Sequence, residues 1–146
     1  MMGRILAVDP GEKRIGLAVS DPTGTIAGPY KVILHAARAL DAALIAVEAA
    51  DLGAVRIIVG QATDSEGLPS PEGRKAARLA EAIAGQTTLP VELWDESFST
   101  QMARQARIAM GVSRNRRSGH MDDLAAAVIL QSYLDAHAGQ PEREQP

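Results

Sequence analysis

Residues 5–20 constrain the fold of this chain more than any other stretch, because they set a charged turn that begins with Asp9 between two apolar runs. The runs cover residues 5–8 and 15–19, and a turn rich in Pro, Gly and charged residues separates them. Short apolar runs with such a turn are typical of a β-hairpin, and runs that are apolar on both faces predict strands at the centre of a sheet. Asp9 lies at the mouth of the first strand. Its carboxylate is costly to desolvate unless a metal ion, a basic side chain or backbone amides surround it.

The rest of the chain predicts a third strand followed by alternating helices and strands. We expect the third strand at residues 26–34, and Pro29, which has no N–H to donate, marks it as an edge strand. The later expected elements are a helix at 35–52, based on the helical spacing of Ala37, Leu40, Ala43, Leu44, Val47 and Ala50, a strand at 55–59, a helix that begins after residue 70, a strand at 90–94, and helices at 100–110 and 122–137. The order βββαβαβαα predicts an α/β fold with a mixed five-stranded sheet and helices on both faces.

The helix after residue 70 has the clearest sequence signals. Ser70 can cap its first turn, and Pro71 fits the first helical position. Its predicted inner stripe consists of Ala76, Leu79, Ala80 and Ile83, and its outer strip is basic, with Arg74, Lys75 and Arg78. We therefore expect this helix to pack on the sheet and to present positive charge to solvent.

Composition indicates one globular domain. The chain has 146 residues, of which 46% are hydrophobic, and it has no cysteine. We expect a single domain over residues 1–138 and a disordered tail over residues 139–146. The absence of cysteine excludes disulfides and thiolate metal sites, and no apolar run is long enough to span a membrane. Both observations predict a cytoplasmic location and no membrane partner.

Positive charge is concentrated in one part of the chain, although the net charge is −3. No Asp or Glu occurs between residues 97 and 121, where the basic residues are Arg104, Arg107, Arg114, Arg116, Arg117 and His120. The local sign of charge matters more than the total when a protein meets a polyanion. This stretch therefore favours a nucleic-acid partner, whereas its other interpretation is a solvated loop.

Acidic residues occur at the ends of three expected elements. Asp9 and Glu96 each follow a strand, and Asp122 and Asp123 open the last helix. In an α/β sheet ligands gather at the carboxyl ends of the strands, so these acids can converge. Carboxylates that lie together repel one another and need a cation, and oxygen ligands without Cys favour Mg²⁺ or Mn²⁺. Taken singly, each acid could instead be a turn former, an exposed residue or a helix-terminus charge.

Three segments of the chain resemble the YqgF (RuvX) family of pre-16S rRNA nucleases and Holliday junction resolvases, which has an RNase H-like fold. Residues 9–16, DPGEKRIG, resemble the family's D-x-G-x-x-R-I-G opening. Residues 95–100, DESFST, resemble its D-E-R-L-[ST]-T motif, and residues 121–134 resemble its closing helix. The resemblance covers nearly the whole chain, up to about residue 135.

The resemblance implies a metal-dependent nuclease with Asp9, Glu96 and Asp122 as the catalytic and metal-binding acids. Asp123 is the alternative register for the third acid. Two Mg²⁺ or Mn²⁺ ions would position an attacking water and stabilise the leaving oxygen of a phosphodiester. The implied function is processing of the 5′ end of pre-16S rRNA in ribosome biogenesis, with Holliday junction resolution in DNA as the alternative. The expected oligomeric state is a monomer or a weak homodimer.

Several other residues are candidates for contact with nucleic acid. His120 could clamp a phosphate or protonate the leaving group, and Phe98 could stack on an unpaired base. The candidates for backbone phosphate contacts are Lys13, Arg14, Arg104, Arg107, Arg114, Arg116 and Arg117.

The chain departs from the family pattern in two places. Ser97 and Phe98 replace the usual Arg-Leu pair, and Gln61-Ala62 stand where the family has Leu-Pro.

Two other classes of protein remain as alternatives. One is a nucleotide-binding ATPase of the actin or sugar-kinase type, for which the chain is short. The other is a non-enzymatic RNA-binding module, which would need the arginines but not the acids.

Overall fold

The computed structural model describes residues 3–96 and 122–138, and this part of the chain contains eight helices and strands. They are β1 (Arg4–Pro10), β2 (Arg14–Ser20), β3 (Ala27–Leu34), α1 (Arg38–Leu52), β4 (Ala54–Gln61), α2 (Pro71–Ala84), β5 (Val91–Asp95) and α5 (Asp122–His137). Seven of the eight match the sequence prediction within a few residues, and α5 matches it at both ends. The helix predicted at 100–110 lies outside the described residues. Within the described part, no helix is long and apolar enough to cross a membrane.

The five strands form one mixed sheet in the order β3-β2-β1-β4-β5. β2 runs antiparallel to both β1 and β3, whereas β1, β4 and β5 are parallel to one another. The hairpin strands β1 and β2 are therefore central or next to central, and β3 with its Pro29 is an edge strand, as predicted. Because β1, β4 and β5 are parallel, their carboxyl ends meet at one edge of the sheet.

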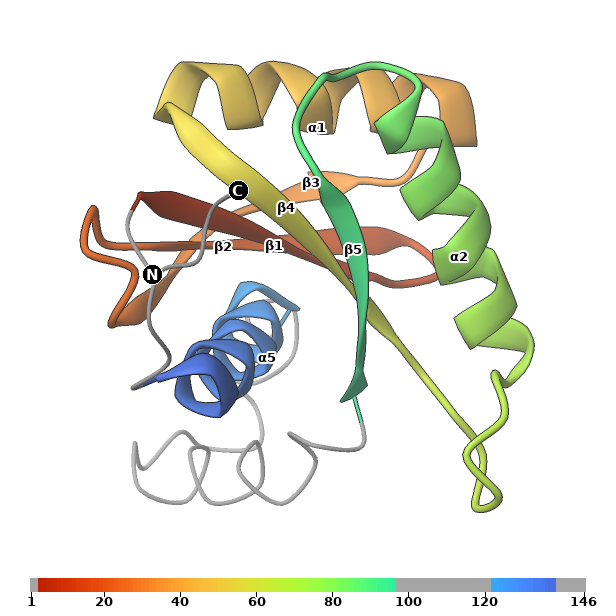
Figure 1. The fold of residues 1–146 in the computed structure, drawn as a ribbon. Coiled ribbons are helices and arrows are strands. Elements are labelled where there is room, and N and C mark those ends of the chain that lie inside the picture. The colour runs from red at the N-terminus through yellow and green to blue at the C-terminus, as the bar shows by residue number, and fades with distance from the viewer. Residues whose placement is uncertain (1–2, 97–121, 139–146) are drawn as a thin grey trace, which may run out of the picture.

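Helices cover both faces of the sheet (Figure 1). α1 and α2 pack on one face, where Leu6 and Val8 of β1 belong to the core. α5 packs on the other face, where Ile5 and Ala7 belong to a second core. Since side chains alternate along a strand, Asp9 continues the series of Ile5 and Ala7 and points to the α5 face.

α1 packs through a different stripe from the one that predicted it. Ala42, Ile45 and Ala49 are buried against the sheet, whereas Leu40, Leu44 and Val47 are 64%, 42% and 53% exposed. The small Ala residues let the helix lie close to the sheet. Asp41 and Glu48 are also buried on this inner side, where both have hydrogen-bond partners. The inner stripe is therefore less apolar in sequence than the exposed one.

Glu48 links α1 to the edge strand β3. Its Oε1 accepts a hydrogen bond from the Tyr30 hydroxyl at 2.7 Å, and its Oε2 accepts one from Lys31 Nζ at 2.9 Å. The hydrogen bonds from Lys31 and then from Tyr30 hold the pKa of Glu48 below its ordinary value of 4.5, although burial opposes them. The ionised form is therefore the one that the folded protein stabilises.

Replacing Glu48 with Gln is expected to lower the free energy of unfolding by about 1 kcal/mol at pH 7, the scale of a hydrogen bond to a charged group. Because the folded-state pKa is depressed, this contribution is present above pH 4.5 and is lost as the pH falls through the folded-state pKa. Urea unfolding of both proteins at pH 7 and at pH 3 tests this. The two proteins should differ at pH 7, and the difference should be smaller at pH 3. A difference that is the same at both values would contradict the assignment.

Candidate active site

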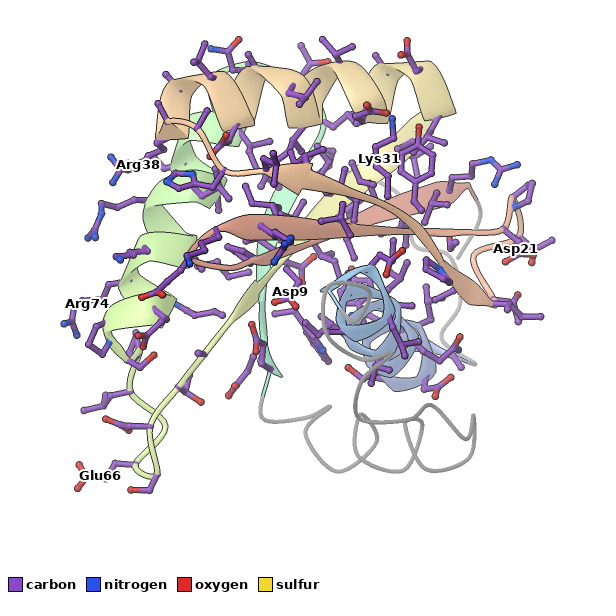
Figure 2. The ribbon with its side chains drawn as sticks, turned by 180° about the vertical axis from the view of Figure 1, so that it is seen from behind. Asp9, Asp21, Lys31, Arg38, Glu66 and Arg74 are labelled. Atoms are coloured by element: carbon purple, nitrogen blue, oxygen red, sulfur yellow. The ribbon has the colours of Figure 1, made fainter. Side chains whose placement is uncertain are left out.

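Asp9 lies at the centre of the sheet, one residue before the end of β1. It pairs with Gly16 of β2, and β4 follows on its other side. Figure 2 shows the Asp9 side chain on the side of the sheet where α5 lies. The residue is partly buried.

Glu96 follows β5 directly and meets Asp9 across the intervening strand. The two carboxyl groups share a hydrogen bond. Burial raises the pKa of Glu96 above its ordinary value of 4.5, the hydrogen bond with Asp9 partly offsets this, and the nearby charge of Asp95 raises it further. A hydrogen bond between two carboxyl groups requires a proton on one of them, because two carboxylates would repel. The structure thus brings together two of the three predicted acids, 87 positions apart in the sequence.

Gly60 of β4 makes this approach possible. A Cβ at this position would lie 3.1 Å from Glu96 Oε2, 3.2 Å from Glu96 Cγ and 3.0 Å from Cδ1 of Ile129 in α5. The Glu96 side chain therefore lies against the backbone of β4, in the space between β5 and β1. The sequence indicated only that a strand ends near Gly60. The signal that could have identified its role is a glycine inside a strand, which is typical of close approach by another group.

Contacts between β5 and α5 set the position of the helix that Asp122 opens. Trp94 Nε1 donates a hydrogen bond to Ser132 Oγ at 2.8 Å, and the Tyr133 hydroxyl donates one to Glu92 Oε1 at 3.1 Å. The rings of Trp94 and Tyr133 also meet edge to face, with centroids 5.1 Å apart. Burial, with the charge of Glu92, raises the pKa of Tyr133 to about 12, so its hydroxyl remains a donor at physiological pH.

These contacts run in opposite order along the two elements. Glu92 meets Tyr133, Trp94 meets Ser132, and the space beside Glu96 is shared with Ile129. α5 is therefore antiparallel to β5 and begins at the edge where β5 ends. The third predicted acid, Asp122, is the first residue of α5, so the helix starts at the edge that holds Asp9 and Glu96.

The complete predicted triad extends beyond the described side chains. The side chain of Asp122 lies outside them, and among the side chains that the structure describes, Asp123 included, no group of three or more could hold a metal ion. Asp9 and Glu96 are thus the two acids of the predicted three whose side chains are described, and the choice between Asp122 and Asp123 stays a prediction.

Hydrogen bonds connect the loop between β4 and α2 to the end of β5 and to the start of α2. Thr63 Oγ1 donates a hydrogen bond to Asp95 Oδ1 at 2.9 Å, next to Glu96. At the start of α2, Ser70 caps the helix by accepting from Gly73 N, as predicted, and it donates to the Ala62 carbonyl. A Cβ on Gly73 would lie 2.0 Å from that carbonyl oxygen. The loop that carries Gln61-Ala62 in place of the family's Leu-Pro is therefore closed by hydrogen bonds of its own.

The candidates for contact with nucleic acid divide into two groups. Lys13, in the turn after β1, and Arg14, at the start of β2, are exposed near Asp9. The remaining candidates lie outside the described residues: Phe98, Arg104, Arg107, Arg114, Arg116, Arg117 and His120.

Comparisons with known proteins agree on a family and on a fold. A family model described as "RuvX: Holliday junction resolvase" matches residues 3–136. A protein of Symbiobacterium thermophilum named "Putative pre-16S rRNA nuclease" is 41% identical over 138 residues, which cover 94% of this chain and 96% of that protein. A protein of the same name from Desulforamulus reducens is 37% identical and covers 92% of this chain and 98% of its own length.

Solved structures of junction resolvases share the fold. RuvC of T. thermophilus in complex with a Holliday junction substrate superposes with a TM-score of 0.60 at 16% identity, covering 94% of this chain and 96% of that one. The fowlpox virus Holliday junction resolvase gives a TM-score of 0.53 at 16% identity, covering 91% and 99%. The RNase H-like fold that the resemblance implied is thereby confirmed.

Proposed function

Since this chain belongs to the RuvX family, we propose that it is a divalent-metal-dependent nuclease that processes the 5′ end of pre-16S rRNA in the cytoplasm. The single observation that carries the chemistry is the carboxyl pair of Asp9 and Glu96 at the carboxyl edge of the sheet. The names of the relatives supply the substrate.

The carboxyl pair fits a divalent cation. Its donors are all oxygens, which Mg²⁺ and Mn²⁺ prefer. Burial disfavours the charged form of Glu96, and the pair is held together through a hydrogen bond, so a positive ion between the two groups would do what the shared proton does. Asp9 and Glu96 would hold the metal together with Asp122, whose helix begins at the same edge.

The roles of the residues follow from their places in the sheet. Bound as a pair, the metal ions would supply charge stabilisation and an activated water for phosphodiester hydrolysis. Asp9, on the central strand, would hold the metal ions together with Glu96 and Asp122. Lys13 and Arg14, exposed near Asp9, would hold the phosphate backbone of the substrate.

Junction resolution in DNA is the second candidate function, favoured by the description of the family model and by the shared fold. Symmetric cleavage of a four-way junction needs two active sites related by a two-fold axis. Junction resolution would therefore require a homodimer. Processing of an rRNA end does not, and we propose that the single domain at residues 1–138 is a monomer or a weak homodimer.

A cleavage assay distinguishes these functions. We expect purified protein with Mg²⁺ or Mn²⁺ to cut a precursor 16S rRNA fragment near the mature 5′ end and to leave a mobile four-way DNA junction largely intact. EDTA should abolish the cut. Symmetric nicking of the junction with intact rRNA would favour the second function. Binding of RNA with no cleavage under any metal would favour a non-enzymatic RNA-binding module.

A further inference from the structure

A cavity of about 320 Å³ opens on the face of the sheet opposite the Asp9–Glu96 pair. We call it the α1–α2 cavity, because its walls come from the first turns of α1 and from α2, together with the turn between β1 and β2. Pro10, Ile15 and Leu79 supply apolar wall. Its volume lies at the lower end of the range for sites that bind small ligands, so it has room for one small organic group.

Two cations that line the cavity have no partner among the described residues. Arg38 of α1 and Lys75 of α2 are both exposed, and neither forms an ion pair or a side-chain hydrogen bond with the described residues. Figure 2 shows Arg38 and Arg74 on the same side of the molecule, one at the start of α1 and one at the start of α2. Only Arg38 of the two lines the cavity, so its cations are Arg38 and Lys75, one from each helix, on a wall that also carries the acids Glu12, Asp41 and Glu72.

The acidic groups of the cavity do not all compete for these cations. Asp41 is 3% exposed, and both of its oxygens have partners, with Oδ1 accepting from Ala36 N at 3.1 Å and Oδ2 meeting the His35 ring at Nδ1. Glu12 and Glu72 are exposed wall residues. Their carboxylates can accept hydrogen bonds from ribose hydroxyls or from exocyclic amino groups of bases. The cavity therefore offers the groups that one nucleotide needs. Its cations can bind a phosphate, its acceptors can bind a sugar or a base edge, and its apolar wall can contact a base.

We propose that the α1–α2 cavity binds one nucleotide unit of a single-stranded nucleic acid, with its phosphate on Arg38 and Lys75. The inference rests on the proposed nuclease function, because a free strand end or a flanking segment of the substrate is the natural source of such a unit. Continuity supports it: Pro10 and Gly11, which form part of the wall, follow Asp9 directly in the chain. A strand that passes Asp9 can continue around the turn, beside Lys13 and Arg14, into the cavity.

Two double variants of the full chain with equal charge test the proposal. Arg38→Gln/Lys75→Gln removes two positive charges inside the cavity, and Arg74→Gln/Arg78→Gln removes two from α2 outside it. We expect the first variant to bind a short labelled single-stranded RNA about tenfold more weakly in EDTA, measured by fluorescence anisotropy. The slope of log K against log salt should fall by about 0.7 for the one lost phosphate contact. The control should change affinity by less than about threefold.

Equal weakening of both variants would overturn the proposal, because it would show only a general charge effect, and so would unchanged binding of the first variant. A second arm uses adenosine monophosphate as the probe. We expect it to shift the amide NMR signals of residues around the cavity, to do so more weakly than the RNA, and to lose the effect in Arg38→Gln/Lys75→Gln. A free mononucleotide that binds as tightly as the RNA would overturn the assignment to a strand.

The binding assays separate this proposal from the proposed function. They are carried out without divalent cation, so a protein that never cleaves can still show the cavity. Conversely, if the protein is a nuclease but the cavity holds no nucleotide, both double variants will bind the RNA alike in EDTA and will cleave with similar kcat/KM at subsaturating substrate.

Discussion

Replacing Asp9 with Asn is expected to reduce metal-dependent cleavage at least about 10²–10³-fold, the cost of removing one preorganised polar group from an active site. The amide has nearly the same shape as the carboxyl group but carries no charge. The site therefore loses one of the two acidic groups of the pair and should bind a divalent cation more weakly. Stability should not fall, because the substitution removes an acid that shares its surroundings with another acid. The melting temperature is expected to be unchanged or higher.

The matched control is Asp51→Asn, the same substitution at an exposed position on α1. Single-turnover cleavage of the rRNA fragment in Mg²⁺ and in Mn²⁺, with circular dichroism melts of all three proteins, provides the measurement. Asp51→Asn should match the wild type in both. Full activity of Asp9→Asn would remove this residue from the site, and a large fall in its melting temperature would make its role structural.

Replacing Gly60 with Ala is expected to lower cleavage by more than tenfold and stability by about 1–3 kcal/mol, the usual cost of overpacking. The added Cβ would lie 3.0–3.2 Å from atoms of Glu96 and Ile129, tighter than ordinary contact, so Glu96 or α5 must shift. The backbone of Gly60 does not have positive φ, so alanine is compatible with its conformation and the contacts alone cause the effect. Shifts of a few tenths of an ångström matter for catalysis because the acids must converge on one centre.

Gly28→Ala in β3 is the matched control, because a Cβ there meets nothing within 4 Å. This substitution should leave activity unchanged and stability equal or slightly higher, since it restricts the unfolded chain. Adding Ile129→Val to Gly60→Ala removes Cδ1 and should restore part of the lost stability but little of the activity, because the contact with Glu96 persists. Wild-type activity in Gly60→Ala would contradict the close approach of Glu96 to β4.

The fold could be predicted from the sequence where local signals and tertiary packing agree. The hairpin of β1 and β2, the edge position of β3 and the Ser70 cap all have local causes, and α5 begins and ends where the pattern placed it. α1 shows the limit of this reasoning. Its more apolar stripe is exposed, because Glu48 and Asp41 find partners on the inner side that no local pattern reveals.

The candidate site could be predicted in part. Asp9 and Glu96 were identified from their places after strands, and parallel β1, β4 and β5 bring them together. Gly60 was missed because its role depends on a side chain 36 positions away in the sequence. The cations of the α1–α2 cavity were not grouped either, because Arg38 and Lys75 belong to different helices that only the folded sheet places side by side.

The most direct test of the account is the anomalous diffraction signal of crystals soaked in Mn²⁺. We expect peaks within bonding distance of carboxylate oxygens of Asp9 and Glu96 and of one acid at the start of α5, and no such peaks in crystals of Asp9→Asn. Mn²⁺ bound only elsewhere, with the carboxyl groups of Asp9 and Glu96 still joined by their hydrogen bond, would contradict a metal-dependent active site at this edge of the sheet.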